Sequence, residues 1–430
     1  MASTAPSGTR PARRGNLGRP FRWLWASTAA SNAGDGITRT LLPLLVVAGH
    51  PDPVAVAGLT AVNMLPWLLF ALPVGVLVDR VDRRGIVLVS NGVRAAALLG
   101  AALVLTGDRP LPALYALAFV LGIAETLADT AAPAMLPRLV DRRHLERANG
   151  RLSAAQIVLN ETAGPPVAGL LAGLTAAVAL ATGGLLYALA ALLLLGLAPL
   201  ARGGGGDRAG TSDDGAPPRA GDGGVLHGIR EGIGFVLGRR ALRLTLAAST
   251  LYGLVFSATF SMLVLLSTRT LGLSEAGYGL LLAAGSAGAV AGSWLAPRAA
   301  DRVPVVPLAR WSLVASGLAY TALGLARHPV LAALALTANG VFMMGWNIPV
   351  MSLRQRLTPE HLQGRVMSVS RLCAWGAMPV GATLGGLLAK GLSVPAAFVV
   401  SGTVLAAGAL LLLAPLRTDP SPHGDLPDKE

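Results

Sequence analysis

The sequence has few charged side chains, one cysteine and almost no lysine. Only 13% of its 430 residues are charged, which is about half the share typical of a soluble protein. Cys373 is the single cysteine, so an intramolecular disulfide and a cysteine-cluster metal site are both excluded. The sequence also contains no hydrolase nucleophile elbow, no phosphate-binding loop and no metal-ligand cluster. We therefore expect a protein that is not an enzyme and that binds neither a cofactor nor a metal.

The sequence is rich in long apolar segments. Apolar residues make up 53% of the chain and the mean hydropathy is +0.60. A membrane-spanning helix needs about 20 apolar residues, and runs of this length recur throughout the sequence. The sequence predicts an all-α integral membrane protein, embedded in a lipid bilayer, with 12 transmembrane helices. The expected spans are residues 21–47, 54–78, 86–106, 111–136, 152–174, 177–197, 242–266, 276–297, 305–325, 330–351, 366–388 and 396–416.

The net charge of +13 has two explanations, of which nucleic-acid binding is the first. The second is membrane topology, because basic residues gather on the cytoplasmic side of a membrane protein. With the expected spans, 28 of the 35 basic residues fall on the side of the two termini and 4 on the other side. This asymmetry favours topology over nucleic acid. It predicts cytoplasmic termini in the inner membrane of a bacterial cell.

The apolar runs fall into two groups separated by a polar centre. Residues 200–224 are rich in Gly, Pro and Asp and have no apolar periodicity, which is typical of a flexible linker. Residues 227–243 alternate apolar and charged positions and predict an amphipathic helix on the inner membrane surface. The expected organisation is a disordered cytoplasmic tail (1–20), a six-helix bundle (21–199), a cytoplasmic linker (200–241), a second six-helix bundle (242–416) and a second disordered tail (417–430). A polar loop is expected at residues 137–151.

The two groups repeat each other. Gly75 corresponds to Gly292, residues 133–151 resemble 349–365, and residues 166–173 resemble 379–386, at offsets of 213 to 217. Three matches that occur in the same order in both groups indicate a duplicated unit and hence two pseudo-symmetric bundles. Two parallel halves joined by a central linker resemble the plan of the major facilitator superfamily. That resemblance implies a carrier with a small-molecule site between the halves near mid-membrane, which works by rocking of the two bundles.

Charged residues inside the spans are the candidate proton and cavity residues. Each costs about 2.5–3.5 kcal/mol on insertion scales, so such residues rarely face lipid. Asp35 and Arg39 are four residues apart on one helical face; they either pair with each other or line the cavity. Glu125 and Asp129 have the same spacing, and two like charges on one face raise the pKa of one carboxyl group.

Three readings of the second pair stay open. Glu125 and Asp129 either exchange protons, form a structural network with Arg94, or belong to a cytoplasmic gate. Glu161 is a third proton-site candidate. Among the aromatic residues within spans, Trp346 and Trp375 either pack against neighbouring helices or line an apolar cavity.

The stretch GVLVDRVDRR, residues 75–84, resembles the signature loop between helices 2 and 3 of the major facilitator superfamily. That resemblance implies two six-helix bundles and a loop that latches the cytoplasmic side. It assigns the latch to Gly75, Asp79, Arg80, Arg83 and Arg84, with Arg371 among their possible partners or in the gate itself.

A second motif lies in the fifth expected span. Residues 160–169, NETAGPPVAG, resemble the Gly-Pro motif of proton-coupled drug antiporters in the same superfamily. Proline bends a helix and glycine allows close packing, which also occurs in transmembrane helices without this function. The motif residues are Gly164, Pro165, Pro166 and Gly169.

Residues 31–46 and 122–140 resemble the branch of enterobactin exporters and macrolide-efflux proteins, a similarity that covers nearly the whole chain. The resemblance implies a monomeric secondary transporter that exports a small amphipathic organic compound in exchange for protons. Uptake by proton symport and a non-transporting sensor or scaffold are the alternatives. The Gly-Pro motif disfavours the first, and the lack of a folded cytoplasmic domain disfavours the second.

Overall fold

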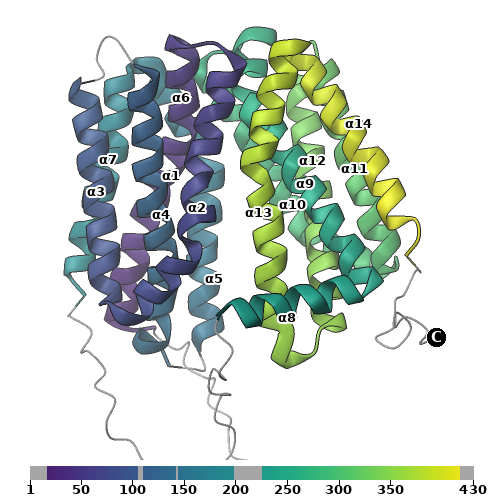
Figure 1. The fold of residues 1–430 in the computed structure, drawn as a ribbon. Helices are drawn as coiled ribbons and strands as arrows, with labels where there is room; N and C mark the ends of the chain where they lie inside the picture. Colours follow the sequence, from purple (N-terminus) through teal and green to yellow (C-terminus); the bar gives the residue numbers. More distant parts are fainter. Residues whose placement is uncertain (1–16, 105–109, 142–143, 198–224, 417–430) are drawn as a thin grey trace, which may run out of the picture.

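The chain folds into two bundles of helices. Figure 1 shows a computed structural model, which describes residues 17–104, 110–141, 144–197 and 225–416. Within these ranges the side chains of residues 71, 72, 75, 76, 79, 146, 225–229, 360 and 361 are not described. The described residues contain no β-strand. Helices satisfy their own backbone hydrogen bonds, which is the requirement that a lipid environment imposes.

The first bundle contains the helices before the polar centre of the chain. Its fifth helical segment is a continuous rod that changes from α-helix to π-helix and back to α-helix along its length. α1 packs on α7 and on this rod, and α2 and α3 pack on α4. The elements are α1 (Gly18–Gly49), α2 (Pro53–Arg80), α3 (Arg83–Val104), α4 (Leu111–Leu139), the rod α5 (Leu145–Ala155), η2 (Gln156–Ala163) and α6 (Gly164–Leu174), and α7 (Ala176–Leu195).

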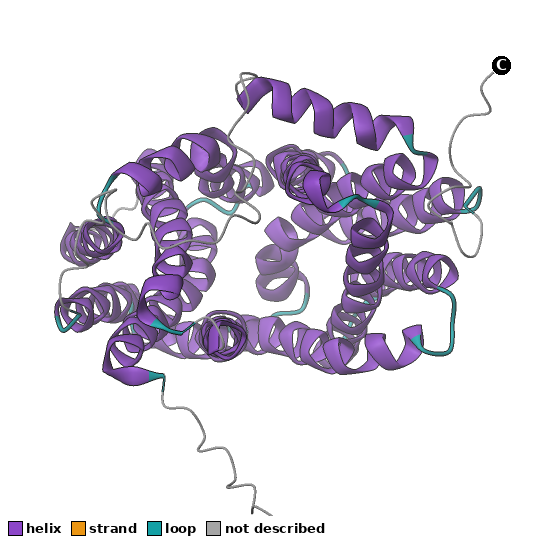
Figure 2. Ribbon diagram, turned by 90° about the horizontal axis from the view of Figure 1, so that it is seen from below, coloured by secondary structure: helices purple, strands orange, loops and turns teal. Residues whose placement is uncertain are grey.

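The second bundle repeats this plan. α10 packs on α12, α11 on α12 and α14, and α9 on α13 and α14. α8 lies across the ends of the other helices rather than along them, and it contacts α9 and α13 (Figures 1 and 2). The elements are α8 (Val225–Gly238), α9 (Arg240–Leu265), the π-helical η3 (Leu266–Thr270), α10 (Glu275–Ala300), α11 (Val305–Leu325), α12 (Pro329–Leu357), α13 (Glu360–Gly391) and α14 (Val394–Leu413).

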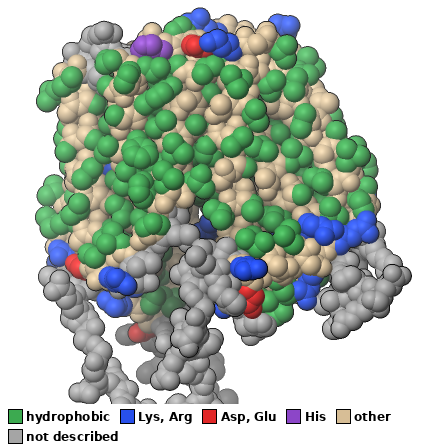
Figure 3. Space-filling view, in the orientation of Figure 1, with side chains coloured by type: hydrophobic (Ala, Val, Ile, Leu, Met, Phe, Trp, Pro, Cys, Tyr) green, Lys and Arg blue, Asp and Glu red, His purple; other side chains and the backbone are tan. Residues whose placement is uncertain are grey.

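We call the end of the molecule that carries α8 and the first turn of α1 the lower face, and the opposite end the upper face. Nine helices of the described residues are long and apolar enough to cross a membrane. In Figure 3 charged side chains gather at the two faces, and an apolar band lies between them. The molecule is therefore a multi-pass membrane protein whose bundles stand across the bilayer.

Glycines set the distances between helices. A Cβ built on Gly292 of α10 would lie 2.7 Å from the Val341 carbonyl oxygen of α12, and a Cβ on Gly317 of α11 would lie 2.6 Å from the Gly402 carbonyl oxygen of α14. Since backbone atoms cannot move aside as a side chain can, only glycine fits these crossings. Lipid gives no hydrophobic force between helices, so such close packing holds the bundles together.

The boundaries differ from the sequence expectation mainly at the lower face. The expected polar loop at 137–151 is largely helical, because α4 continues to Leu139 and α5 begins at Leu145. Arg138 lies on α4, and Arg147 and Arg151 lie on α5, so the density of charge marks the membrane interface and not the helix end. α1 also begins at Gly18, before the expected position 21. The expected linker at 200–224 and most of both tails lie outside the described residues.

Candidate functional site

A buried ion pair joins α1 to α3. Arg94 Nη1 donates to Asp35 Oδ1 at 3.0 Å, and the two side chains are 1% and 8% exposed. Tyr187 of α7 donates its hydroxyl hydrogen to the same Asp35 oxygen at 2.7 Å. Arg94 Nη1 also donates to Ser31 Oγ at 3.0 Å, and its guanidinium lies 5.0 Å from the centre of the Tyr187 ring. One carboxylate thus neutralises one guanidinium inside the first bundle.

The second ion pair of this bundle is open to water. Arg39 Nη2 lies 3.4 Å from Glu125 Oε1, and the two side chains are 47% and 19% exposed. Arg39 also interacts electrostatically with Asp129 and Glu161, whose side chains are exposed. Charged groups in the middle of a span avoid lipid, which makes these four residues candidates for a water-accessible position.

This arrangement differs from the pairing that helical spacing suggests. Asp35 and Arg39 form no ion pair with each other; Asp35 bonds to Arg94 and Arg39 bonds to Glu125. Arg94 therefore does not neutralise Glu125 by direct contact. The reason is tertiary: the partner on another helix, Arg94 of α3 or Glu125 of α4, is closer than the partner along α1.

The Gly-Pro motif explains the π-helical segment η2. Proline has no backbone N–H, so Pro165 cannot donate to the Glu161 carbonyl one turn earlier. The freed Glu161 carbonyl accepts a hydrogen bond from Ser286 Oγ of α10 in the second bundle. π-helical segments occur often at functional sites, and this one carries Glu161 at the contact between the bundles.

The glycines of the motif bring neighbouring helices into backbone contact. A Cβ built on Gly164 would lie 2.7 Å from the Gly36 Cα of α1. A Cβ on Gly169 would lie 2.8 Å from the Ala276 Cα of α10. The motif therefore ties the rod to α1 within its own bundle and to α10 of the other bundle.

The bundles also meet between α2 and α13 at the upper face. Lys390 Nζ donates to Asp52 Oδ2 at 3.3 Å, and Val54 N–H donates to Asp52 Oδ1 at 3.0 Å. The Val54 N–H has the largest effect on the pKa of Asp52 and lowers it; burial opposes this by less, and Lys390 lowers the pKa further. A Cβ on Gly386 would lie 3.0 Å from the Pro53 carbonyl oxygen, so the two backbones nearly touch. The upper ends of the bundles are thus closed against each other.

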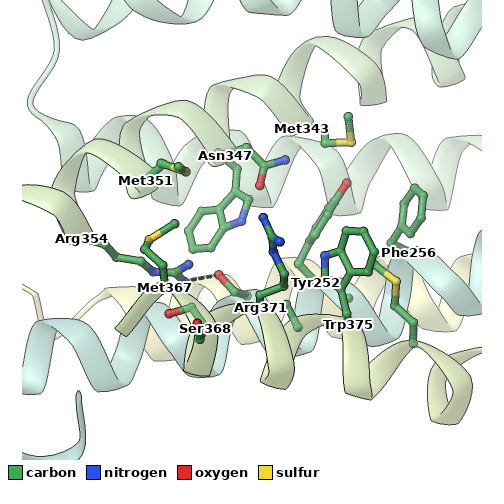
Figure 4. A pocket seen from close by; sticks show the side chains of 16 residues that line it. Tyr252, Phe256, Met343, Asn347, Met351, Arg354, Met367, Ser368, Arg371 and Trp375 are labelled. Atoms are coloured by element: carbon green, nitrogen blue, oxygen red, sulfur yellow. Dashed lines mark hydrogen bonds between the residues drawn. The ribbon is translucent and has the colours of Figure 1, made fainter. Parts of the chain in front are cut away.

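A cavity of about 530 Å³ lies in the second bundle, lined by α9, α12 and α13 (Figure 4). Its volume is within the range of small-molecule sites. Arg354, close to the lower end of α12, belongs to its wall, so the cavity extends toward the lower face. Aromatic rings and methionines dominate the lining: Tyr252, Phe256, Trp346, Trp375, Met343, Met351, Met367 and Met378.

Both tryptophans named from the sequence lie in this wall. Trp346 is buried, at 1% exposure, and contributes packing as well as cavity surface. Trp375 is 45% exposed and its ring meets Trp67 of α2 edge to face, with centroids 5.3 Å apart. Trp375 therefore connects the cavity wall to the first bundle.

The charges of the cavity are positive. Arg354 donates to the Thr245 carbonyl oxygen and to Ser249 Oγ, which are neutral acceptors. Arg371 projects from α13 into the cavity, in the direction of Asn347 and beside Tyr252 (Figure 4). No described residue forms a hydrogen bond or an ion pair with Arg371, and no carboxylate lines the cavity.

The signature loop holds the lower end of the first bundle together. Asp82 caps α3 by accepting from Arg84 N and Gly85 N, each at 3.2 Å. Arg83 Nη1 donates to the Ala134 carbonyl oxygen of α4 at 2.6 Å, and Arg84 Nε donates to the Leu194 carbonyl oxygen of α7 at 3.3 Å.

These contacts stay within one bundle. Arg80 is exposed at the end of α2, and the side chains of Gly75 and Asp79 lie outside the described residues. The latch therefore stays a prediction. Arg371, one of its possible partners, lines the cavity.

Sequence reasoning missed several residues of the site. Tyr187 is the one aromatic residue of the apolar helix α7, and its hydroxyl is the signal that could have marked it as a hydrogen-bond partner. Arg354 and the methionines carried no such signal, because only the folding of α12 and α13 around α9 brings them together. Asp52 and Lys390 are 338 positions apart and are joined only by tertiary structure.

Comparison with known sequences gives one family and several relatives. The family described as "Transmembrane secretion effector" matches residues 17–421. The multidrug efflux pump Tap of Mycobacterium tuberculosis is 29% identical over 90% of this chain and 91% of its own length. Macrolide efflux protein A of Streptococcus pyogenes is 23% identical over 90% of this chain and 93% of its own length.

Solved structures of transporters share the fold. The nucleoside transporter NupG superposes with a TM-score of 0.74 at 12% identity and covers 92% of this chain and 99% of its own. A bacterial homologue of the iron transporter ferroportin in an inward-facing state gives a TM-score of 0.71 at 18% identity, covering 93% of this chain and 100% of its own. At these identities the likeness concerns the fold alone.

Proposed function

Because the chain belongs to the transmembrane secretion effector family of the major facilitator superfamily, we propose that it exports a small amphipathic organic compound in exchange for protons. It is a membrane transporter and not an enzyme. The efflux function of the two named relatives supports export as the direction. The observation that carries the proton coupling is the group of Glu125, Asp129 and Glu161 around Arg39 in mid-membrane.

The proposal includes a topology. α1, the rod α5–η2–α6 and α11 stand beside the nine apolar spans, which gives 12 crossings in two six-helix bundles. α8 and the many arginines at the lower face make that face cytoplasmic, together with both termini. The chain acts as a monomer in the bacterial cytoplasmic membrane, because the charged groups and the cavity are complete within one copy.

Alternating access follows from the contacts between the bundles. The upper ends are closed by Asp52 and Lys390, by Gly386 against Pro53, and by Gly169 against α10. The cavity wall reaches the lower end of α12, so the described state is inward-facing. Rocking about the Trp67–Trp375 contact opens the upper face as the lower ends approach.

Protonation of Glu125 is the coupling step. The ionised carboxylate holds Arg39 at 3.4 Å, and this pair bridges α1 and α4. A proton on Glu125 neutralises the carboxylate and releases Arg39, which then interacts with Asp129 or Glu161 on other helices. Because the pair is accessible to water in the inward-facing state, the proton leaves to the cytoplasm there and the substrate enters.

The test measures proton-driven transport in proteoliposomes with an imposed pH gradient. Glu125→Gln is expected to abolish gradient-driven drug movement while exchange without a gradient continues. Asp301→Asn, which removes an exposed carboxylate at the end of α10, serves as the control and is expected to transport normally. Undiminished gradient-driven transport by Glu125→Gln would refute the coupling role. Gradient-driven uptake in the opposite direction would refute export.

A further inference from the structure

The charged groups of the two bundles differ in sign. The first bundle presents Glu125, Asp129 and Glu161 around Arg39. The cavity of the second bundle presents Arg354 and Arg371 without any carboxylate. Proton exchange occupies the acidic side in the proposed function, and the basic side has no role in it.

Arg371 is the notable group of the cavity. Its guanidinium points into a space of about 530 Å³ and has no partner among the described residues. A guanidinium presents a planar fork of N–H donors that matches a carboxylate or a sulfonate. Ser249 and the Thr245 carbonyl group hold Arg354, so its charge remains uncompensated in the same cavity.

The rest of the wall fits flat apolar groups. Trp375 and Tyr252 supply ring faces, and Met367 and Met378 supply flexible thioethers that adapt to several shapes. Such surfaces accept varied ligands, whereas the few polar groups of a cavity decide which kind of ligand is retained.

We propose that this cavity binds amphipathic anions, with an aromatic or other flat apolar body against Trp375 and Tyr252 and an acidic group on Arg371. The inference rests on the proposed export function and defines its substrate class. The acidic group then lies in the second bundle, apart from the carboxylates of the first bundle. The negative charges of the first bundle would repel an anion that bound there, so the ligand is directed to the second bundle.

The experiment uses three anthracene probes that differ only in charge: anthracene-carboxylate, anthracene-methanol and anthracene-methylammonium. Binding to the full-length protein in nanodiscs is measured by energy transfer from tryptophan, with empty nanodiscs correcting for partition into lipid. Wild type is expected to bind the carboxylate most tightly. Arg371→Gln is expected to weaken carboxylate binding about 10- to 100-fold, as for the loss of hydrogen bonds to a charged group, and to leave methanol-probe binding unchanged.

Retained binding of the neutral probe establishes that the variant cavity is folded. Arg356→Gln removes an exposed arginine of α12 outside the cavity and is expected to behave as wild type. Equal affinity of wild type for all three probes would overturn the proposal, and so would equal weakening of all three by Arg371→Gln. Carboxylate binding that depends on Arg371, together with no gradient-driven transport, would support the site and refute export instead.

Discussion

The buried pair of Asp35 and Arg94 makes the sharpest stability prediction. In Asp35→Asn the side chain keeps its size and can still accept from Tyr187, but the Arg94 charge is left without a counter-charge at 1% exposure. Arg94 Nε and Nη2 already lack hydrogen-bond partners among the described residues, so no other group takes over. Breaking one half of a buried pair costs about 3–5 kcal/mol, a large part of a total stability of about 5–15 kcal/mol.

The assay is unfolding of the purified protein in detergent, followed by tryptophan fluorescence. The double variant Asp35→Leu/Arg94→Met removes both charges and is expected to recover most of the loss, because replacing a whole buried pair with apolar groups is near neutral. Asp301→Asn controls for the loss of a surface carboxylate and is expected to change stability by less than about 0.5 kcal/mol. A stable Asp35→Asn protein that no longer transports would refute this reasoning and make Asp35 a proton or substrate group.

Two further predictions concern contacts between helices. Gly164→Ala introduces a Cβ 2.6 Å from the Leu159 carbonyl oxygen and 2.7 Å from the Gly36 Cα, and overpacking of this kind costs about 1–3 kcal/mol in unfolding measurements. Gly173→Ala of the same helix meets no atom within 4 Å and is the matched control; equal stability of the two variants would contradict the close crossing. At the upper face the lowered pKa of Asp52 means that its ion pair with Lys390 is present above about pH 4 and is lost as pH falls through that lowered pKa. Spin labels introduced by Gly49→Cys and Leu392→Cys in a Cys373→Ser background should therefore report wider distances at low pH, and Asp52→Asn should widen them at neutral pH. Distances that do not change in either case would exclude the pair as a closing contact.

Much of the architecture could be predicted from the sequence because it depends on local composition. The apolar runs, the two groups of helices and the amphipathic segment before α9 are visible in the order of residues, and the resemblance to the major facilitator superfamily is confirmed by the family match. The helix ends at the lower face were less accurate. Charged residues mark the point where a helix leaves the lipid. The helix itself continues into water wherever its own backbone hydrogen bonds remain favourable.

The sequence allowed the charged residues of the spans to be named but not their pairing. Asp35, Arg39, Arg94, Glu125, Asp129 and Glu161 could be named because a charge inside a span is costly wherever it stands. Which charges pair depends on the positions of α3 and α4 relative to α1, because Arg94 of α3 bonds to Asp35 and Glu125 of α4 bonds to Arg39. The spacing of four residues suggested that Asp35 pairs with Arg39. In the structure each of the two is closer to a partner on another helix.

The sequence by itself determined that this chain is a helical membrane transporter with charges in its spans, because insertion into lipid is decided segment by segment. Only the tertiary structure decided that Arg39 pairs with Glu125 and that Arg371 lies in the wall of the second bundle's cavity. The same structure joined Asp52 to Lys390 and turned the missing N–H of Pro165 into a link between bundles. Those arrangements depend on residues far apart in sequence, and packing between helices sets the distances between them.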